Sequence, residues 1–340
     1  MLISRTAEAW IAIRPAFPEE LDWAVENNAR VASSLQEFPV ALAMVHTTLN
    51  DVDICEGVPS VDVLSQLKAL LGGLDISLFS LRRVRCLVKF ETGKSKSPAS
   101  LLDSFAANQL KEAIDVVSVL NQIARPGCLG VAGGVVVVDN KILSTITRQW
   151  FMYELLSGDS RRIVWPQIVD LSLTQVCSWS GELGALSSAI ARTRVQRSFA
   201  ALTYALSLPS VQAGETLFRA MQGLEAFFSD GVGDLRRQLS EKSQLWLGAS
   251  GKSKNIVGHL YDLRSSYVHG SANLSYSFGL HDSWEEDRQT SKKLSEGVEF
   301  AVRLLLATIQ RCIRDQVFEL QWKYGYEAQP IVVNPSRILR

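Results

Sequence analysis

Arg264 and His269 are the two residues of this chain whose types and spacing best suit a chemical reaction, with four residues between them. A histidine can remove the proton from a ribose 2′-hydroxyl near neutral pH. An arginine can bind the adjacent phosphate and stabilise the negative charge that builds on it in the transition state. Because the 2′-hydroxyl supplies the nucleophile, this chemistry cleaves RNA without a metal ion or cofactor, and we expect neither.

The spacing of this pair is weak evidence by itself. A chain with 23 arginines and 4 histidines contains roughly 0.8 such matches by chance. On an unbroken helix, positions five apart lie about 140° apart around the axis, so Arg264 and His269 would not share a face. Gly270 indicates that the helix ends or distorts at His269. Alternatively, a second chain brings its own pair alongside, which predicts a composite site in a homodimer.

The elements that must position the pair read as helices. After Ser180 we expect helices separated by short stretches with Gly, Ser or Pro, and a compact bundle is the natural architecture for them. The predicted helices span Glu182–Leu208, Ala213–Phe228, Asp234–Leu247, Ser253–His269 and Trp284 to about Trp322. This predicts an all-α domain over residues 181–325, followed by a C-terminal tail over 326–340.

The segment that carries the pair, Tyr-Asp-Leu-Arg-Ser-Ser-Tyr-Val-His-Gly at 261–270, resembles the signature of the HEPN superfamily. This form of it is similar to the ApeA-like branch, as is the upstream helix Thr216–Phe228, which contains Leu-Glu-Ala-Phe at 224–227. The resemblance covers roughly residues 185–322. It implies a helical, usually dimeric domain, often a ribonuclease of antiviral defence or toxin systems, with Arg264 and His269 as the catalytic pair.

Four further residues are candidates for supporting roles. By position in the resemblance, Glu225 matches an acidic residue that orients Arg264, and Ser265 takes the place of a polar residue that is often Asn, Asp or His. Asp262 can orient a catalytic group, although its position favours a solvated carboxylate on a helix face. Tyr267 suits packing in the core or in a dimer better than it suits chemistry.

Other interpretations of the same residues stay open. Arg264 can be a surface arginine bonded to Asp262 or Glu225, and His269 can be a helix C-cap that interacts with the helix dipole. The domain would then be a non-catalytic module for dimerisation or for binding nucleotides or RNA. A third possibility is a structural partner subunit that acts through its N-terminal domain.

Basic residues near the pair suggest a surface for RNA. The candidates are Arg192, Arg194, Arg197, Lys252 and Lys254, with Arg236 and Arg237 nearby. Such residues can position a phosphate backbone around the site. A solvated helix face explains them equally well. Over the whole chain 35 basic residues balance 35 acidic ones, which argues against a protein that scans long duplexes but not against one that binds a short single strand.

The first 180 residues read as an α+β domain, for which we expect a role in sensing or partner recognition, including a possible regulatory partner protein. Predicted helices span Pro18–Phe38, Ser60–Leu71 and a longer segment from Pro98 to the Pro-Gly pair at 126–127. Predicted extended segments cover 76–92, Val135–Val138, Ile142–Trp150 and Arg161–Leu173.

Composition favours a cytoplasmic globular protein. Apolar residues make up 47% and charged residues 21% of the chain, as in ordinary folded domains. The N-terminal segment is a poor signal peptide because Arg5, Glu8 and Arg14 interrupt it. No apolar run is long enough to cross a membrane. The five scattered cysteines predict free thiols rather than disulfides or a zinc site.

Overall fold

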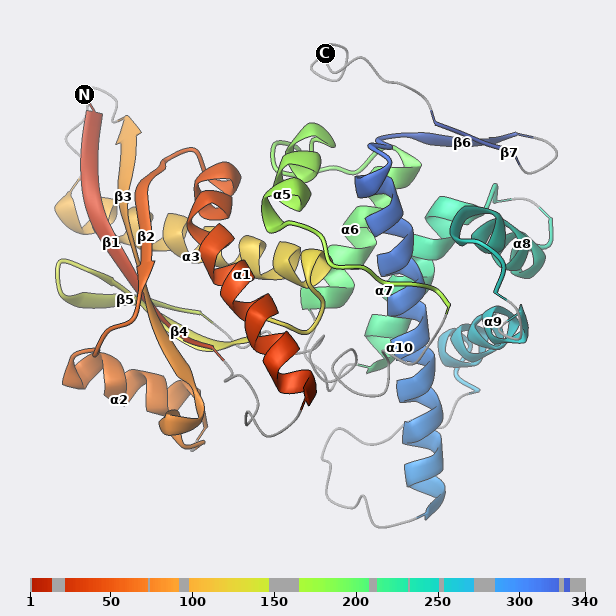
Figure 1. The fold of residues 1–340 in the computed structure, drawn as a ribbon, viewed down its shortest axis with the longest axis horizontal. Helices are drawn as coiled ribbons and strands as arrows, with labels where there is room; N and C mark the ends of the chain where they lie inside the picture. The colour runs from red at the N-terminus through yellow and green to blue at the C-terminus, as the bar shows by residue number, and fades with distance from the viewer. Residues whose placement is uncertain are drawn as a thin grey trace. The chain divides into compact units, whose positions relative to one another are not determined.

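A five-stranded antiparallel sheet organises the N-terminal half of the chain (Figure 1). Its strand order is β2-β3-β1-β4-β5. The strands are β1 Leu2–Ile13, β2 Leu49–Cys55, β3 Ser80–Glu91, β4 Val131–Val138 and β5 Lys141–Ile146. The extended segments predicted at 76–92, Val135–Val138 and Ile142–Trp150 are confirmed over Ser80–Glu91, Val135–Val138 and Ile142–Ile146. Ile76–Leu78 form a 3₁₀ turn instead, and residues 147–150 lie outside the described residues. The central strand, β1, has no counterpart among the predictions.

The computed structural model describes residues 2–13, 22–72, 74–91, 98–146, 165–207, 213–231, 233–250, 254–271, 285–323 and 327–330. Two compact units are present. Unit 1 comprises Met1–Ser157 and Asp170–Ser178, and unit 2 comprises Gly158–Val169 and Trp179–Arg340. The division passes through helix α5, Leu173–Glu182. The predicted functional domains 1–180 and 181–325 stay a prediction, because compactness does not show which part acts alone.

Helices cover both faces of the sheet in unit 1. They are α1 Asp22–Val45, α2 Val61–Leu70 and α3 Ala99–Ala124, with a 3₁₀ turn at Ile76–Leu78. Side chains alternate between the faces of a strand. On β1, Trp10 packs with residues of α2 and β4, whereas Arg5 on the other face pairs with Asp103 of α3 at 2.8 Å. The N-terminal half is therefore an α+β arrangement, as expected.

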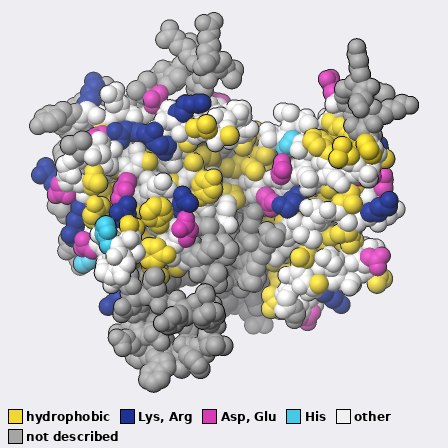
Figure 2. Space-filling model, turned by 180° about the vertical axis from the view of Figure 1, so that it is seen from behind, with side chains coloured by type: hydrophobic (Ala, Val, Ile, Leu, Met, Phe, Trp, Pro, Cys, Tyr) yellow, Lys and Arg dark blue, Asp and Glu magenta, His cyan; other side chains and the backbone are white. Residues whose placement is uncertain are grey.

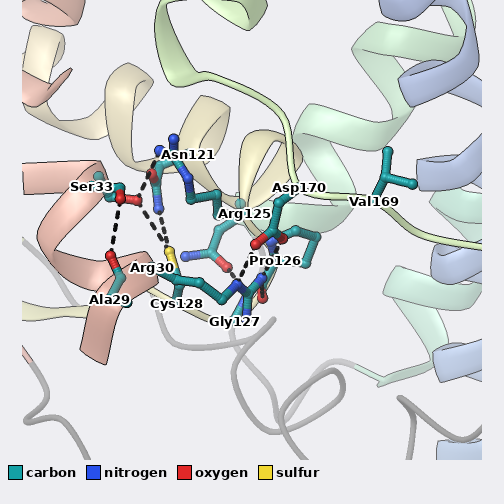
Figure 3. Close-up of polar contacts among 12 residues, drawn as sticks. Ala29, Arg30, Ser33, Asn121, Arg125, Pro126, Gly127, Cys128, Val169 and Asp170 are labelled. Atoms are coloured by element: carbon teal, nitrogen blue, oxygen red, sulfur yellow. Dashed lines mark hydrogen bonds and ion pairs between the residues drawn. The ribbon is translucent and has the colours of Figure 1, made fainter. Parts of the chain in front are cut away.

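Polar side chains connect the segment that begins at Asp170 to the helices of unit 1 (Figure 3). Arg30 of α1 donates to both carboxylate oxygens of Asp170, at 2.6 and 2.7 Å, and to the carbonyl of Pro126 at 3.0 Å. Asn121 of α3 donates to the thiol of Cys128 at 3.5 Å. These bonds join α1 and the end of α3 to the segment at Asp170, which lies about fifty residues after α3.

Glu37 is the most heavily bonded carboxylate of this region. It pairs with Arg125 and accepts hydrogen bonds from the Ser172 hydroxyl at 2.6 Å and the Thr174 amide at 3.0 Å. Burial by itself raises the pKa of Glu37, but the bonds from Ser172, Arg125 and Thr174 outweigh it and hold the pKa below its ordinary value of 4.5. The folded state therefore favours the ionised form.

We expect Glu37→Ala to lower the free energy of unfolding of unit 1 by about 3 kcal/mol, because it leaves the mostly buried Arg125 guanidinium without its carboxylate. The Glu37 contribution is present above the unfolded pKa and is lost as pH falls through the folded pKa. The difference in the free energy of unfolding between wild type and Glu37→Ala should therefore become smaller below about pH 4.5. Denaturant titration followed by hydrogen exchange in α1 and α3 measures it.

The matched control for this prediction is Glu112→Ala, which removes an exposed glutamate of α3. A surface substitution of this kind changes stability by at most about 0.5 kcal/mol. Equal losses in the two variants, or a gap that widens in acid, would show that the bonds to Glu37 do not stabilise unit 1.

Helices make up most of the described part of unit 2 (green to blue in Figure 1). They are α6 Arg194–Ser207, α7 Ala213–Phe228, α8 Leu235–Leu247, α9 Lys254–Val268 and α10 Glu285–Arg314. α10 packs against the other four. At the crossing of α6, α7 and α10, a Cβ on Gly223 would lie 2.7 Å from Leu305 and 3.0 Å from Ala201. Only glycine lets these three helices approach so closely.

The predicted helices are right for α7, α8 and α9 and wrong in part elsewhere. The helix predicted at Glu182–Leu208 is helical only from Arg194 to Ser207, which form α6. Glu182 is the last residue of α5, and Gly184 after it has a φ of +81°. The last predicted helix stops at Arg314 and is followed by a hairpin of β6, Leu320–Lys323, and β7, Glu327–Pro330. β6 thus lies inside the domain predicted to be all-α over residues 181–325, and the predicted C-terminal tail contains β7.

Two further predictions differ from the structure. The strand predicted at Arg161–Leu173 is wrong over its described residues, since 165–172 pair with no strand there and Leu173 begins α5. The first helix runs from Asp22 to Val45 and includes Pro39, whereas Pro18 and its neighbours lie outside the described residues. No described helix combines the length and apolar character needed to cross a membrane.

Candidate functional site

Helix α9 carries the candidate pair and ends in a defined cap. The His269 amide still donates to the Ser265 carbonyl at 3.0 Å, so the helical pattern is regular up to His269. Gly270 then takes a φ of +72°. Its amide donates to Tyr267 and the Ser271 amide donates to Ser266, at 3.3 and 2.9 Å, the pattern of a Schellman motif. His269 is therefore the C-cap residue, as one interpretation of the sequence predicted, and it is exposed.

Arg264 lies against α7. Its Nη2 is 3.7 Å from Oε2 of Glu225, and its guanidinium carbon is 6.0 Å from the centroid of the Phe218 ring. Phe218 and Glu225 are seven residues apart, which places them on one stripe of α7. Both members of the ion pair are 24% exposed. The structure thus brings together Arg264 and Glu225, and it adds Phe218, which no prediction included.

The ion pair leaves bonding capacity unused. Nε of Arg264 and Oε1 of Glu225 are buried, and neither has a hydrogen-bond partner within the described residues. At 3.7 Å the contact between the two groups is also longer than a hydrogen bond. A buried guanidinium N–H without a partner costs free energy. The Arg264 side chain as a whole remains 24% exposed, so the accessible part of its guanidinium can bind an additional anionic partner such as a phosphate oxygen.

Arg264 and His269 do not point in the same direction. Because α9 keeps its regular hydrogen bonds through His269, the two positions lie about 140° apart around the axis and about 7.5 Å apart along it. Gly270 ends the helix but does not turn His269 towards Arg264. One chain therefore presents the arginine to α7 and the histidine to solvent on another side of α9.

Tyr267 packs against the start of α7. An added Cβ on Gly214 would lie 2.1 Å from two atoms of the Tyr267 ring, so the ring rests directly on the glycine backbone. Tyr267 contacts the beginning of α7 and Arg264 contacts a later part of it, so the two helices run antiparallel. The contact fixes the end of α9, and with it the position of His269.

Asp262 faces α8 and not Arg264. Its carboxylate is 3.2 Å from Nη1 of Arg236, and both side chains are about half exposed. Asp262, Ser265 and His269 are spaced three and four apart, so they share one stripe of α9. On this geometry Asp262 is not placed to orient Arg264, and Ser265 contributes the carbonyl that bonds the His269 amide.

An open groove of about 480 Å³ lies between α8 and α9. Its two arginines are both paired with carboxylates, Arg236 with Asp262 and Arg237 with Glu241 at 3.1 Å. The groove therefore has little net positive charge. Its lining residues are Asp234, Arg236, Arg237, Ser240, Glu241, Gly258 and His259.

Only some residues of the predicted basic surface are placed where they could contact a ligand. Arg194 donates to the Ser229 carbonyl and to the Asp230 carboxylate at 2.6 Å, so it closes the end of α7 rather than facing a ligand. The same carboxylate pairs with the buried Lys242 at 2.5 Å. Arg192 and Arg197 are exposed, and Arg197 donates to the Arg192 carbonyl at 2.6 Å.

The remaining two predicted RNA-binding residues cannot be placed. Lys252 and the side chain of Lys254 lie outside the described part of the chain. Figure 2 shows Lys and Arg side chains interspersed with Asp and Glu over the visible face. The RNA-binding surface predicted from these lysines and the arginines of α6 stays a prediction.

Thiol and metal chemistry receive no support from the described residues. All five cysteines are free, as predicted. Burial raises the pKa of the Cys86 and Cys177 thiols to about 12, so neither is a nucleophile near neutral pH. In the part of the chain that the structure describes, no three His, Cys, Asp or Glu side chains gather as they would around a metal ion.

The chain was compared with models of protein families, with curated proteins and with solved structures, and none of the three comparisons gave a match.

Proposed function

We propose that this chain is a metal-independent RNA endonuclease of the HEPN type, with Arg264 and His269 as its catalytic pair. The proposal is supported chiefly by one observation. The Arg264 guanidinium is held by Glu225 with a buried N–H unsatisfied, and the same helix ends in an exposed histidine. A general base and a cation that stabilises the phosphoryl oxygens are the groups that assist cleavage through a ribose 2′-hydroxyl, and a histidine and an arginine can supply them.

The proposed reaction is a transfer of the phosphoryl group within the RNA. His269, as general base, takes the proton of the 2′-hydroxyl, and the 2′-oxygen attacks the adjacent phosphorus. The bond from phosphorus to the 5′-oxygen breaks, and the protonated His269 imidazole returns a proton to this leaving oxygen. Arg264 stabilises the negative charge on the phosphoryl oxygens. The products carry a 2′,3′-cyclic phosphate and a 5′-hydroxyl.

The geometry of α9 favours a site shared by two chains. Because Arg264 and His269 lie on different sides of one helix, we propose a homodimer in which the arginine of one chain and the histidine of its partner meet at the scissile phosphate. From the resemblance we propose a role in a cytoplasmic defence or toxin system, in which unit 1 recognises a trigger or a regulatory partner protein.

The proposal is tested by incubating the purified protein with single-stranded RNA in EDTA. We expect cleavage to continue in the chelator and to yield 2′,3′-cyclic phosphate ends, because no step requires a metal ion. The same sequence with 2′-deoxy sugars should remain intact, since it lacks the nucleophile. Cleavage that appears only on addition of Mg²⁺, or that leaves 3′-hydroxyl ends, would contradict the mechanism.

A second function is compatible with the separation of the two residues. If Arg264 holds a phosphate and His269 never reaches it, the domain is a non-catalytic module for RNA or nucleotide binding and dimerisation. A dimer that binds RNA tightly, and leaves it uncut at high protein concentration, would favour this alternative.

A further inference from the structure

A row of aromatic rings and guanidinium groups runs from the surface of α6 to Arg264. The Arg219 guanidinium carbon lies 5.4 Å from the centroid of the Tyr204 ring and 5.8 Å from that of Phe218. The Arg264 guanidinium carbon lies 6.0 Å from the same Phe218 ring. The row therefore links a tyrosine of α6 to the arginine of the proposed site through one shared phenylalanine of α7.

The outer end of this row is both accessible and held in place. Tyr204 is 61% exposed. Arg219 is bonded to Glu215 at 2.9 Å and to Gln222 at 3.3 Å, so its planar group is fixed next to the Tyr204 ring. A flat ligand that stacks here would order few further side chains, which lowers the entropic cost of binding.

We propose that Tyr204 and Arg219 form a stacking platform for an unpaired base of single-stranded RNA. Aromatic faces and guanidinium planes are the groups on which unstacked RNA bases are bound. The inference rests on the proposed ribonuclease function for its substrate class, and it adds a place where a base near the scissile phosphate is held. A base at Tyr204 and a phosphate at Arg264 are two parts of the same strand.

The charges of the row favour stacking over phosphate binding at its outer end. Arg219 is paired with Glu215, so the platform adds little net positive charge, and Tyr204 has none. Binding to phosphates releases counterions and weakens with salt, whereas stacking does not add to this effect. Loss of the Tyr204 ring should therefore weaken binding without changing its salt dependence.

The platform is tested with the full chain and a short, fluorescein-labelled, mixed-sequence oligonucleotide in which every ribose is 2′-O-methyl. This probe cannot be cleaved. We expect Tyr204→Ala to weaken its binding by about tenfold or more, the effect of losing one base stack. Tyr204→Phe keeps the ring and should bind within about threefold of wild type. Leu245→Ala, at a residue of similar exposure (56%) on α8, is the control and should bind like wild type.

Several outcomes would overturn the platform: no binding of the probe by wild type, equal binding by wild type and Tyr204→Ala, or equally weak binding by the Ala and Phe variants. Conversion of a dimer to a monomer by Tyr204→Ala, measured by light scattering, would instead assign this face to an interface between copies. Failure of the ribonuclease proposal looks different. The probe then binds with the expected order of variants, but unmodified RNA is not cleaved.

Discussion

Replacement of His269 by alanine is expected to lower the rate of RNA cleavage by about 10²- to 10⁴-fold, the range for loss of a general base or acid. The fold should be preserved, because His269 is exposed at the end of α9 and the cap is made by backbone bonds of Gly270 and Ser271. Affinity for an uncleavable RNA should change little, since the phosphate is held by Arg264. The loss should appear in the rate at saturating RNA.

The matched control is His259→Ala, which removes an exposed histidine of the same helix. His259 lines the groove towards α8, so its loss should leave the cleavage rate within about twofold of wild type. Thermal unfolding of both variants checks that α9 is intact. Cleavage by His269→Ala at the wild-type rate, or equal losses in both variants, would show that the catalytic base lies elsewhere.

The helices around the site could be predicted from sequence because their ends are marked locally. Asp234 precedes α8, and its carboxylate accepts a hydrogen bond from the Arg237 amide, as in an ordinary N-cap. Gly270 ends α9 through a positive φ that glycine takes at no cost. A third local signal marks the start of α6. Thr193 and Gln196 form a capping box at the start of α6, with bonds of 3.1 Å in each direction.

Other boundaries depend on residues that carry no such mark. α10 ends in a Schellman pattern, in which the Val317 amide bonds the Cys312 carbonyl and Gln316 takes a φ of +53°. Glycine is the usual residue there, so Gln316 gave no warning of the stop. The strand wrongly predicted at 165–172 likewise carries no local residue that marks its true conformation. The Gln310 side chain makes hydrogen bonds with both the amide and the carbonyl of Val169. In a sheet, the backbone of a neighbouring strand would make these two bonds instead.

Within the site, the sequence predicted the contact between Glu225 and Arg264 but not its surroundings. The pairing follows from residues on two helices that were both predicted with the right limits. Phe218 could have been found, because it precedes Glu225 by two helical turns. The ion pair of Arg194 could not have been found from sequence. Its partner Asp230 is distant along the chain, and the bond depends on how α6 meets the end of α7.

The shared site leads to a prediction about mixtures of inactive chains. Arg264→Gln and His269→Ala should each be inactive alone, but equal amounts refolded together should recover roughly a quarter of the wild-type activity. About half of the dimers are then heterodimers of a two-fold symmetric assembly. In each of these, one of the two sites receives an intact arginine from one chain and an intact histidine from its partner.

The control pairs Arg264→Gln with the double variant that carries both substitutions. That mixture has no chain with Arg264, so no recovery is expected at any ratio. Recovery in the first mixture alone requires the arginine and the histidine to act across the dimer. Inactivity of both mixtures, with heterodimers verified by mass, would mean that both residues must come from one chain. The regular hydrogen bonds up to His269 would then have to break on binding RNA, because an intact α9 holds the two side chains about 140° apart.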